Sequence, residues 1–469
     1  MQEFDVAVIG AGPAGISAAI ESAALGVSVA LIDDSPLPGG KVFAYPVNYL
    51  EGSERKIRNR LFRGMGHFKD RIFIFSETEV WNIQGEYTLG LCRKEISGAK
   101  PLEIRANKII ISIGALERSL PFSGWTLPGV FSLGGMNKLA KKGIVPGKRI
   151  LIAGSGPLQL VLAYHLLKAG GSIEGIINIA SPMQMVGGLP GIFTSASYSL
   201  LKSGLRYLIN IKVNRIPTYF SHAVSRIDGT DGVESVTIVK LDKCHKPVKG
   251  SERQINADCV GYGLGLIPSL DLTRLCGCAH VFDEELGYWR PKLNGNMETT
   301  RPGVFVAGDC LTIKGYLAAI EEGKIAAAEA CYQLGVHNKN HLGSTFAASS
   351  RKLKRYRRFA RALEALSRPR PGLLDLITED TVVCRCEEVT FGQIRSAVTA
   401  GARDINDIKR RTRLGMGHCQ GRFCGQVINE LIMKLTGNMQ KREMFTSRIP
   451  ARPIPFGVLS GQCGGHDDL

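Results

Sequence analysis

Four cysteines near the end of the chain have the spacing of a metal or redox site. Cys384 and Cys386 stand in "VVCRCEE", and Cys419 and Cys424 stand in "GHCQGRFCG", which gives C-x-C-x32-C-x4-C. Two close pairs joined by a helical hairpin can surround one small centre. Four thiolates bind either a 2Fe–2S cluster or zinc, and the residues alone leave both open, with free thiols as a third reading. His418 is interpreted as an exposed neighbour rather than a ligand.

The segment between these pairs has helical signals. Thr390 and Gln393 fit a capping box that opens one helix, and "DINDIKRRT" predicts a second. Cys424 continues into "GQVINELIMKL", which predicts a third helix. A small helical unit is therefore expected to position the four thiols.

A glycine motif at the other end of the chain has the spacing of a dinucleotide site. "VAVIGAGPAGISAAIESAALGVSVALID" (6–33) predicts a strand, a glycine turn, a helix and a second strand. G-x-G-x-x-G allows a tight turn, close approach of a pyrophosphate and close packing of helix on strand. An acidic residue after the second strand can accept hydrogen bonds from ribose hydroxyls. The candidate residues here are Gly10, Gly12, Pro13, Ala14, Gly15, Asp33 and Asp34.

A distant stretch favours FAD over NAD at this site. "RPGVFVAGDC" resembles the second FAD fingerprint of the pyridine-nucleotide disulfide oxidoreductase superfamily, whose aspartate binds the ribityl chain. The resemblance also implies a helix that begins near Tyr316 and points its positive end at the flavin, a glycine pair in "LPGGKV" and a backbone contact with adenine. "ISIGA" departs from the A-T-G turn usual there. The further candidate residues are Gly40, Lys41, Val80, Gly114, Gly308 and Asp309.

A second strand–turn–helix unit, "GKRILIAGSGPLQLVLAYHLLKAGG", repeats the first about 145 residues later. Gly154, Ser155 and Gly156 form its turn, but Gln159 stands at the third glycine position. Its second strand ends in "INIAS", without the acid or arginine of an NAD(P) site. The interpretations are an adenine nucleotide (ATP or NAD(P)) bound without hydride transfer, an empty inherited fold or, less favoured, a working NAD(P)H site.

Composition narrows the class of protein. The 469 residues are 44% apolar and 22% charged, and no apolar run has the roughly 18–20 residues of a membrane helix. The N-terminus lacks a signal-peptide pattern, so a cytoplasmic location is expected, with attachment at the inner membrane through partners as the alternative. Twelve cysteines without any C-x-x-C suit a reducing compartment and argue against a dithiol reductase. Cys276 and Cys278 are interpreted as core thiols.

The net charge of +17 is uneven, because residues 351–372 hold nine basic residues and one acidic residue. This stretch predicts a solvated helical linker, with a docking strip for an acidic partner as the alternative. No nucleic-acid-binding motif accompanies it, so nucleic acid is not expected as a partner.

The chain as a whole resembles the alpha subunits of heteromeric flavin-dependent amino-acid dehydrogenases, which include opine oxidases, proline and hydroxyproline dehydrogenases and hydrogen cyanide synthase. "GALERSLPFSGWTLPGVFSLGG", "GYGLGLIPSLDL" and "VVCRCEEVTFGQIRSAV" carry the resemblance. It implies an α/β flavoprotein with two dinucleotide-binding domains, like glutathione and thioredoxin reductase. It also implies a small C-terminal helical 2Fe–2S domain like bacterioferritin-associated ferredoxin, which favours the cluster over zinc. Lys41 departs from the glutamine common in that family.

The resemblance further implies a partner beta subunit, similar to D-amino-acid oxidase, that carries the substrate-oxidising FAD, and often a small ferredoxin-like gamma subunit. We find no catalytic constellation for amine oxidation in this chain, so the catalytic residues are unknown. The alternative function is a stand-alone NAD(P)H-dependent flavin and iron–sulfur reductase. The expected division is 1–118 with 285–345 for FAD, 119–284 NAD-like, 346–378 linker, 379–437 2Fe–2S and 438–469 an extended tail.

Overall fold

The computed structural model describes residues 1–44, 50, 52–85, 87–96, 98–184, 192, 198–336, 339–437 and 442–460. The chain forms two compact units. Unit 1 comprises Met1–Ala115, Ile267–Ala360 and Ser447–Leu469, and unit 2 comprises Leu116–Leu266 and Arg361–Thr446. Unit 2 thus holds both the second glycine turn and the four cysteines. The five-part division expected from the sequence stays a proposal.

Unit 1 is built on a sheet with the strand order β19-β20-β21-β6-β1-β2-β3, and β4 and β5 extend it from β6. Its strands are β1 (Gln2–Ile9), β2 (Val29–Ile32), β3 (Ile72–Phe75), β4 (Thr78–Gln84), β5 (Thr88–Glu95), β6 (Gly98–Ile111), β17 (His280–Asp283), β18 (Tyr288–Pro291), β19 (Leu293–Gly295), β20 (Glu298–Thr299) and β21 (Val304–Val306). Its helices are α1 (Pro13–Ala24), α2 (Gly40–Phe43), α3 (Gly52–His67), α8 (Asp271–Leu275), α9 (Tyr316–Gln333) and α14 (Phe456–Leu459).

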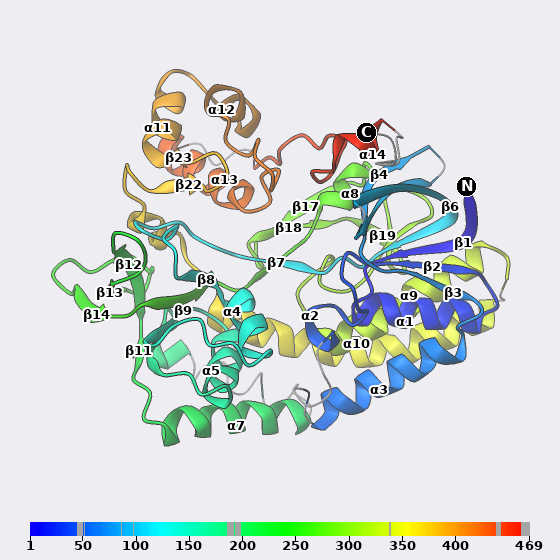
Figure 1. The fold of residues 1–469 in the computed structure, drawn as a ribbon, viewed down its shortest axis with the longest axis horizontal. Helices are drawn as coiled ribbons and strands as arrows, with labels where there is room; N and C mark the ends of the chain where they lie inside the picture. Colours follow the sequence, from blue (N-terminus) through cyan, green and yellow to red (C-terminus); the bar gives the residue numbers. More distant parts are fainter. Residues whose placement is uncertain are drawn as a thin grey trace. The chain divides into compact units, whose positions relative to one another are not determined.

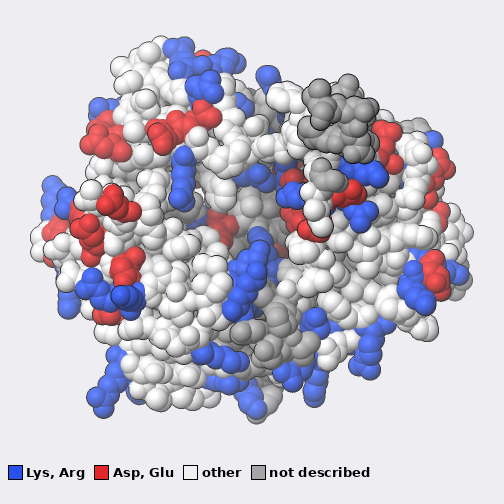
Figure 2. Space-filling model, in the orientation of Figure 1, with Lys and Arg blue, Asp and Glu red and all other residues white. Residues whose placement is uncertain are grey.

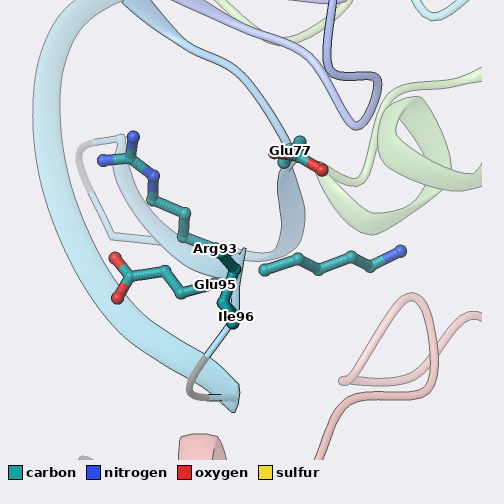
Figure 3. Close-up of a pocket in the computed structure, with 5 residues that line it drawn as sticks. Glu77, Arg93, Glu95 and Ile96 are labelled. Atoms are coloured by element: carbon teal, nitrogen blue, oxygen red, sulfur yellow. The ribbon is translucent and has the colours of Figure 1, made fainter.

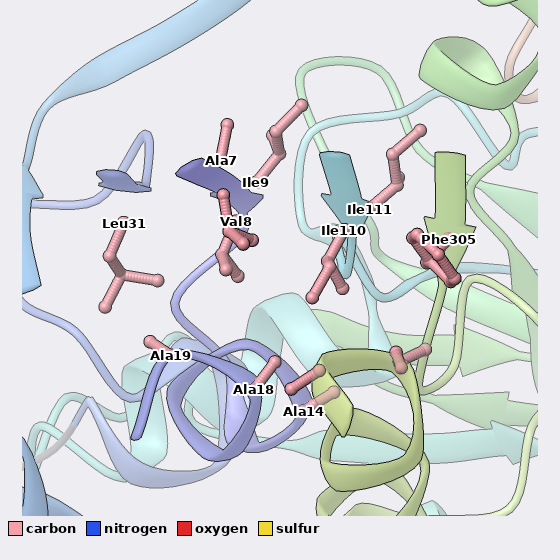
Figure 4. Close-up of a cluster of buried hydrophobic side chains, with 14 of the residues drawn as sticks. Ala7, Val8, Ile9, Ala14, Ala18, Ala19, Leu31, Ile110, Ile111 and Phe305 are labelled. Carbon is pink, nitrogen blue, oxygen red and sulfur yellow. The ribbon is translucent and has the colours of Figure 1, made fainter. Parts of the chain in front are cut away.

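The central strands of this sheet are parallel. β1 pairs in parallel with both β2 and β6, and β21 pairs in parallel with β6. Parallel strands buried on both faces read as continuous apolar runs, as "VAVI" (6–9) and "III" (109–111) do. Figure 4 shows the side chains of Val8, Ile110 and Phe305 above α1 and α9. The carboxyl ends of β1, β2 and β21 therefore meet at one edge, where the first glycine turn lies.

Helices α1 and α9 run side by side beneath this sheet (Figure 1). Gly323 of α9 allows the close approach, because a Cβ there would lie 2.2 Å from the carbonyl oxygen of Ala14. The alanine-rich faces of both helices are buried. Helix α9, which follows the second FAD-like fingerprint, is thereby packed against α1, the helix of the first glycine motif.

Unit 2 contains a second parallel sheet in the order β11-β10-β9-β15-β8 and an antiparallel sheet β12-β13-β14. Its strands are β8 (Val130–Ser132), β9 (Ile150–Gly154), β10 (Ile173–Asn178), β11 (Thr218–Phe220), β12 (His222–Asp228), β13 (Ser235–Lys240), β14 (Arg253–Asn256), β15 (Cys259–Gly263), β22 (Val382–Cys384) and β23 (Val389–Thr390). Its helices are α4 (Leu133–Ala140), α5 (Leu158–Lys168), α7 (Tyr198–Val213), the 3-10 helix η2 (Pro371–Leu376), α11 (Phe391–Thr399), α12 (Ile405–Thr412) and α13 (Cys424–Thr436). Strands β7 (Ala115–Glu117) and β16 (Leu266–Pro268) stand where the chain passes between the units.

The cysteine segment has the helices that its sequence predicts. Thr390 and Gln393 form a complete capping box at α11, and the side chain of Asp404 caps α12. The core of this segment continues into the second glycine-turn sheet of unit 2, and Trp125 Nε1 donates to the carbonyl of Val382 at 2.6 Å. The cysteine segment and that sheet therefore share one core.

Residues 351–367 of the basic stretch lie in α10 (Lys339–Ser367), where Leu353 is buried and the Lys and Arg side chains between 351 and 361 are exposed. An exposed helix is therefore confirmed for this part, and the roles as a linker and as a docking strip stay proposals. Figure 2 shows Lys and Arg side chains spread over the face in view, with Asp and Glu among them. None of the described helices combines the length and apolar character that a membrane crossing requires.

Candidate functional site

The first glycine turn lies between the end of β1 and the start of α1 in unit 1. A Cβ on Gly15 would lie 1.8 Å from the carbonyl oxygen of Gly10, and one on Gly10 would lie 2.5 Å from that of Ser112. Gly10 also has φ +101°, which disfavours other residues. Gly12 differs from both, because a Cβ there would meet nothing within 4 Å. Gly10 and Gly15 thus build the turn, and Gly12 leaves room beside it.

Asp33 follows β2 and reaches this turn. Its Oδ2 accepts from Ala11 N at 2.5 Å and its Oδ1 accepts from Ser35 N at 2.9 Å. Burial raises the pKa of the Asp33 carboxyl. A carboxylate has about four acceptor positions, so two hydrogen bonds leave room for ribose hydroxyls. The side chain of Asp34 is 56% exposed and forms an ion pair with Arg452.

The glycine pair packs against the same turn. Gly39 N donates to Ala11 O at 2.7 Å, and a Cβ on Gly40 would lie 2.9 Å from Gly12 Cα. Lys41 Nζ donates to Ala115 O at 2.5 Å, which ties α2 to the segment after β6. The structure therefore brings Gly40 beside Gly12.

Gly114 has φ +75°, and its carbonyl accepts from Ser269 N at 3.1 Å. Val80 lies buried in β4. These two residues stay candidates for flavin and adenine contacts, respectively.

Asp309 follows β21, and its carboxylate accepts hydrogen bonds from the loop that leads into α9. Its Oδ1 accepts from Lys314 N at 3.2 Å and Gly315 N at 3.4 Å, and burial raises the pKa of its carboxyl. Gly308 N donates to the buried Glu322 at 3.0 Å, and Glu322 also forms an ion pair with Lys314 at 2.6 Å. The start of α9 at Tyr316 matches the prediction. Neither Glu322 nor Lys314 was predicted, although the acidic pair Glu321 and Glu322 within an alanine-rich helix is a detectable signal for Glu322.

The second glycine turn, in unit 2, is packed differently. Gly154 approaches β15 so closely that a Cβ would lie 1.8 Å from Gly263 O, and Ser155 N donates to that oxygen at 3.0 Å. Gln159 is buried, and its Nε2 donates to Ile177 O at 2.8 Å. Asn178, at the end of β10, accepts from Ala180 N. An amide thus fills the space under the helix, and the strand ends in another amide where an NAD site has an acid.

The four cysteines come together as two pairs. Cys384 shares a hydrogen bond with Cys424, and Cys386 shares one with Cys419. The Cys424 thiol and backbone N–H groups lower the pKa of Cys384 to about 5, while the hydrogen bond with Cys384 and burial raise that of Cys424. His418 is exposed, with Nε2 3.7 Å from Cys386 Sγ.

As they stand, no three His, Cys, Asp or Glu side chains in the described part of the chain are arranged to hold a metal ion. The loops nevertheless approach closely, because a Cβ on Gly417 would lie 2.4 Å from Cys386 Cβ. Four thiols from two adjacent pairs are the donor set of a 2Fe–2S cluster or zinc. The donor chemistry therefore fits a cluster.

The family description "Pyridine nucleotide-disulphide oxidoreductase" matches residues 4–333, which is most of the chain. This protein belongs to that family. A second description, "BFD-like [2Fe-2S] binding domain", matches residues 382–434 and so includes all four cysteines. The expected fold class is confirmed. Together the two matches imply FAD and a 2Fe–2S cluster.

The chain is similar along its length to curated members of this oxidoreductase family. One of the opine oxidase subunits of Rhizobium meliloti is 32% identical, and the alignment covers 98% of this chain and 99% of that one. Hydrogen cyanide synthase subunit HcnB of Pseudomonas aeruginosa is 31% identical over 96% of this chain and 97% of its own. The expected relationship to these subunits is confirmed.

Solved structures support the fold. L-proline dehydrogenase from P. horikoshii superimposes with a TM-score of 0.72 at 23% identity, covering 97% of this chain and 79% of that one. Thioredoxin reductase from T. acidophilum gives 0.51 at 22% identity and covers 72% of this chain and 100% of that one. The two-domain reductase architecture is thus shared with proteins of low sequence identity.

Two residues near the C-terminus were missed as parts of these sites. The ring of Phe445 packs against the cysteine loops, where a Cβ on Gly421 would lie 2.3 Å from it and one on Gly415 2.8 Å. Arg452 lies beside Asp34, which directly follows the candidate ribose acceptor Asp33. Neither has a local signal, since each meets its partners through tertiary packing.

A surface depression of about 460 Å³ lies at the β5–β6 hairpin, lined by Glu77, Arg93, Lys94, Glu95 and Ile96. Figure 3 shows Arg93 and Glu95 extending away from Glu77. It contains none of the candidate residues. We assign it no role in cofactor binding.

Gly12→Val is expected to weaken FAD retention without unfolding the protein. A Cβ at position 12 meets nothing within 4 Å in the folded chain, but a pyrophosphate bound at the turn would meet the valine side chain. Overpacking costs about 1–3 kcal/mol, so binding should weaken by roughly one to two orders of magnitude. Flavin absorbance after purification and thermal melting of the apoprotein measure the two effects.

The matched control is Gly66→Val in α3, where a Cβ also meets nothing within 4 Å. It should retain flavin. Full flavin content in Gly12→Val would show that the site is assigned wrongly.

Cys419→Ser is expected to abolish the binuclear cluster, because three thiolates and an alcohol bind it far less well. The paramagnetic signal after dithionite reduction should disappear, and iron content should fall. Cys244→Ser removes an exposed thiol of the same unit and should leave both unchanged. A wild-type-like signal in Cys419→Ser would contradict the ligand assignment.

Proposed function

We propose that this chain is the electron-transfer subunit of a heteromeric FAD-dependent dehydrogenase that oxidises the CH–NH bond of an amino acid or opine. One combination of features carries the proposal. A flavin-type glycine turn and a four-thiol segment occur in one chain, while Gln159 stands at the third glycine position of the second turn and Asn178 ends the following strand. The full-length relatives are named as subunits of opine oxidase and hydrogen cyanide synthase, which supports this role in a larger complex.

We propose the following roles for individual residues. When bound, FAD exchanges two electrons and a 2Fe–2S cluster one, which allows a two-electron donor to serve a one-electron acceptor. Gly12 and Gly40 admit the pyrophosphate, Asp33 accepts from the ribose, and Asp309 accepts from the ribityl chain. The N-terminal end of α9 faces developing negative charge on the flavin with its dipole. Cys384, Cys386, Cys419 and Cys424 hold the cluster.

Substrate oxidation is assigned to another chain. A pocket for an amino acid needs a cation that fixes its carboxylate near the flavin. Arg452 is beside the flavin motifs, but three carboxylates engage its guanidinium. We therefore propose a partner beta subunit, similar to D-amino-acid oxidase, with its own FAD, and a small ferredoxin-like gamma subunit.

The second glycine turn is proposed to bind an adenine nucleotide without hydride transfer. The strand–turn–helix framework of β9 and α5 is intact, which favours a nucleotide such as ATP. A stand-alone NAD(P)H-dependent reductase is the alternative function, and it requires this turn to admit a nicotinamide dinucleotide.

NADH and NADPH are expected to reduce the bound flavin slowly or not at all. Gln159 occupies the space that a third glycine would leave, and no carboxylate follows β10 to accept from a ribose. Anaerobic mixing with each nucleotide, followed at the flavin absorbance band, measures the rate. Rapid bleaching by either one would favour the stand-alone reductase.

The isolated chain is expected to lack amino-acid dehydrogenase activity, and co-expression with the oxidase-like partner should restore turnover of an artificial acceptor. Cys419→Ser in the complex should lower turnover by more than about tenfold, because the cluster relay is lost. Single-turnover reduction of the partner's flavin by substrate should persist in that variant. Robust turnover by the wild-type chain alone, on an opine, a proline derivative or glycine, would contradict the proposed division of labour.

A further inference from the structure

The C-terminal tail inserts into unit 1 beside the first dinucleotide site. Ala451 is 7% exposed and belongs to the main hydrophobic core of that unit. Its backbone N donates to the carbonyl of Trp81 in β4 at 2.9 Å. This contact fixes the direction in which the next residue, Arg452, extends.

Arg452 joins three carboxylates from separate parts of unit 1. Its Nη1 lies 3.0 Å from Glu79 Oε1 and 3.3 Å from Asp34 Oδ2, and its Nε lies 3.0 Å from Asp271 Oδ2. Only 19% of the Arg452 side chain is exposed, against 17% for Glu79 and 8% for Asp271. Burial lowers the pKa of the guanidinium, but Asp271 and Glu79 outweigh this and raise it, so the side chain stays charged.

The partners of the tail flank the residues expected to hold adenosine. Asp34 directly follows Asp33, the candidate ribose acceptor, while Glu79 and Trp81 stand on either side of Val80, the candidate adenine contact. The backbone already joins these segments, because Thr78 N donates to Asp33 O at 2.9 Å. Arg452 adds side-chain contacts to both segments at once.

The charge of Arg452 matters for an anionic ligand. Without it, Asp34, Glu79 and Asp271 would remain close together as carboxylates with Asp33 nearby. Glu79 and Asp271 are largely buried, so the repulsion between their carboxylates would be poorly screened, and the segments would separate or the local field would oppose a pyrophosphate. The planar guanidinium can bind carboxylates at two edges, which an ammonium cannot do equally well.

We propose that Arg452 is a positioning residue for the adenosine half of FAD, acting through Asp34 and Glu79 to hold Asp33 and Val80 in place. The inference rests on the proposed FAD site. It assigns the tail a part in cofactor binding, in addition to its packing. It also predicts that the effect is confined to the adenosine end, because the carboxylates that engage Arg452 belong to other segments than Asp309 and α9.

The test uses full-length apoprotein and two ligands. The FAD dissociation constant is measured by quenching of flavin fluorescence, and the inhibition constant of ADP is measured by its competition with FAD. Arg452→Met should raise the FAD dissociation constant and the ADP inhibition constant by at least about tenfold. Arg452→Lys should raise both constants by a smaller factor. The band positions of flavin bound at saturation should not change.

The control is Arg448→Met, which removes an exposed arginine from the same tail and should leave both constants as in the wild type. If Arg452→Met does not fold, the two constants of Arg452→Lys decide the question. Wild-type constants in the folded Arg452 variant, or weaker FAD binding with unchanged ADP competition, would overturn the inference. Failure of the wild-type apoprotein to bind FAD would contradict the proposed function itself.

Discussion

The close approach of α1 to the end of β1 is the constraint on which the rest of unit 1 depends. A side chain at Gly15 would overlap the carbonyl of Gly10, and one at Gly10 would overlap the carbonyl of Ser112, so the first turn of α1 can contact the strand only if both residues are glycine. Gly323 extends the same constraint to α9, whose approach to the backbone of α1 would also be blocked by a Cβ. The starts of two helices are thereby held at one edge of a parallel sheet. That edge is where a dinucleotide with a pyrophosphate in its middle can be bound from both ends.

In unit 2, the loops that carry the cysteines also pack closely at glycines, but against side chains rather than against backbone carbonyls. The loops that carry the thiols contain glycines at 415, 417 and 421, and Phe445 or Cys386 occupies the space that side chains there would need. Helices α11, α12 and α13 fix the ends of these loops, and their core is shared with the sheet that carries the second glycine turn. The same family fold thus supplies one turn open at Gly12 and another packed around Gln159. The first turn thus leaves space beside Gly12, whereas the second has a buried amide at Gln159.

The sequence predicts those features that depend on neighbouring residues. Pro13 at the first position of α1, the capping box of Thr390 and Gln393, and the start of α9 at Tyr316 are all present. The features that it did not predict join distant segments: Arg452 meets Asp34, and Phe445 meets Gly421. Such contacts have no periodicity or motif, because only the folded core brings the partners together. The pairing of Cys384 with Cys424 and of Cys386 with Cys419 likewise joins residues that are distant in the sequence.

The central claim is that one chain holds a flavin and a cluster rather than a flavin and a structural zinc. Flavin and elemental analysis of the chain purified without oxygen tests it most directly. We expect about one FAD and about two iron atoms per chain, since a 2Fe–2S centre binds through four cysteines. Zinc at about one atom per chain with iron absent, or a chain without flavin, would contradict the account.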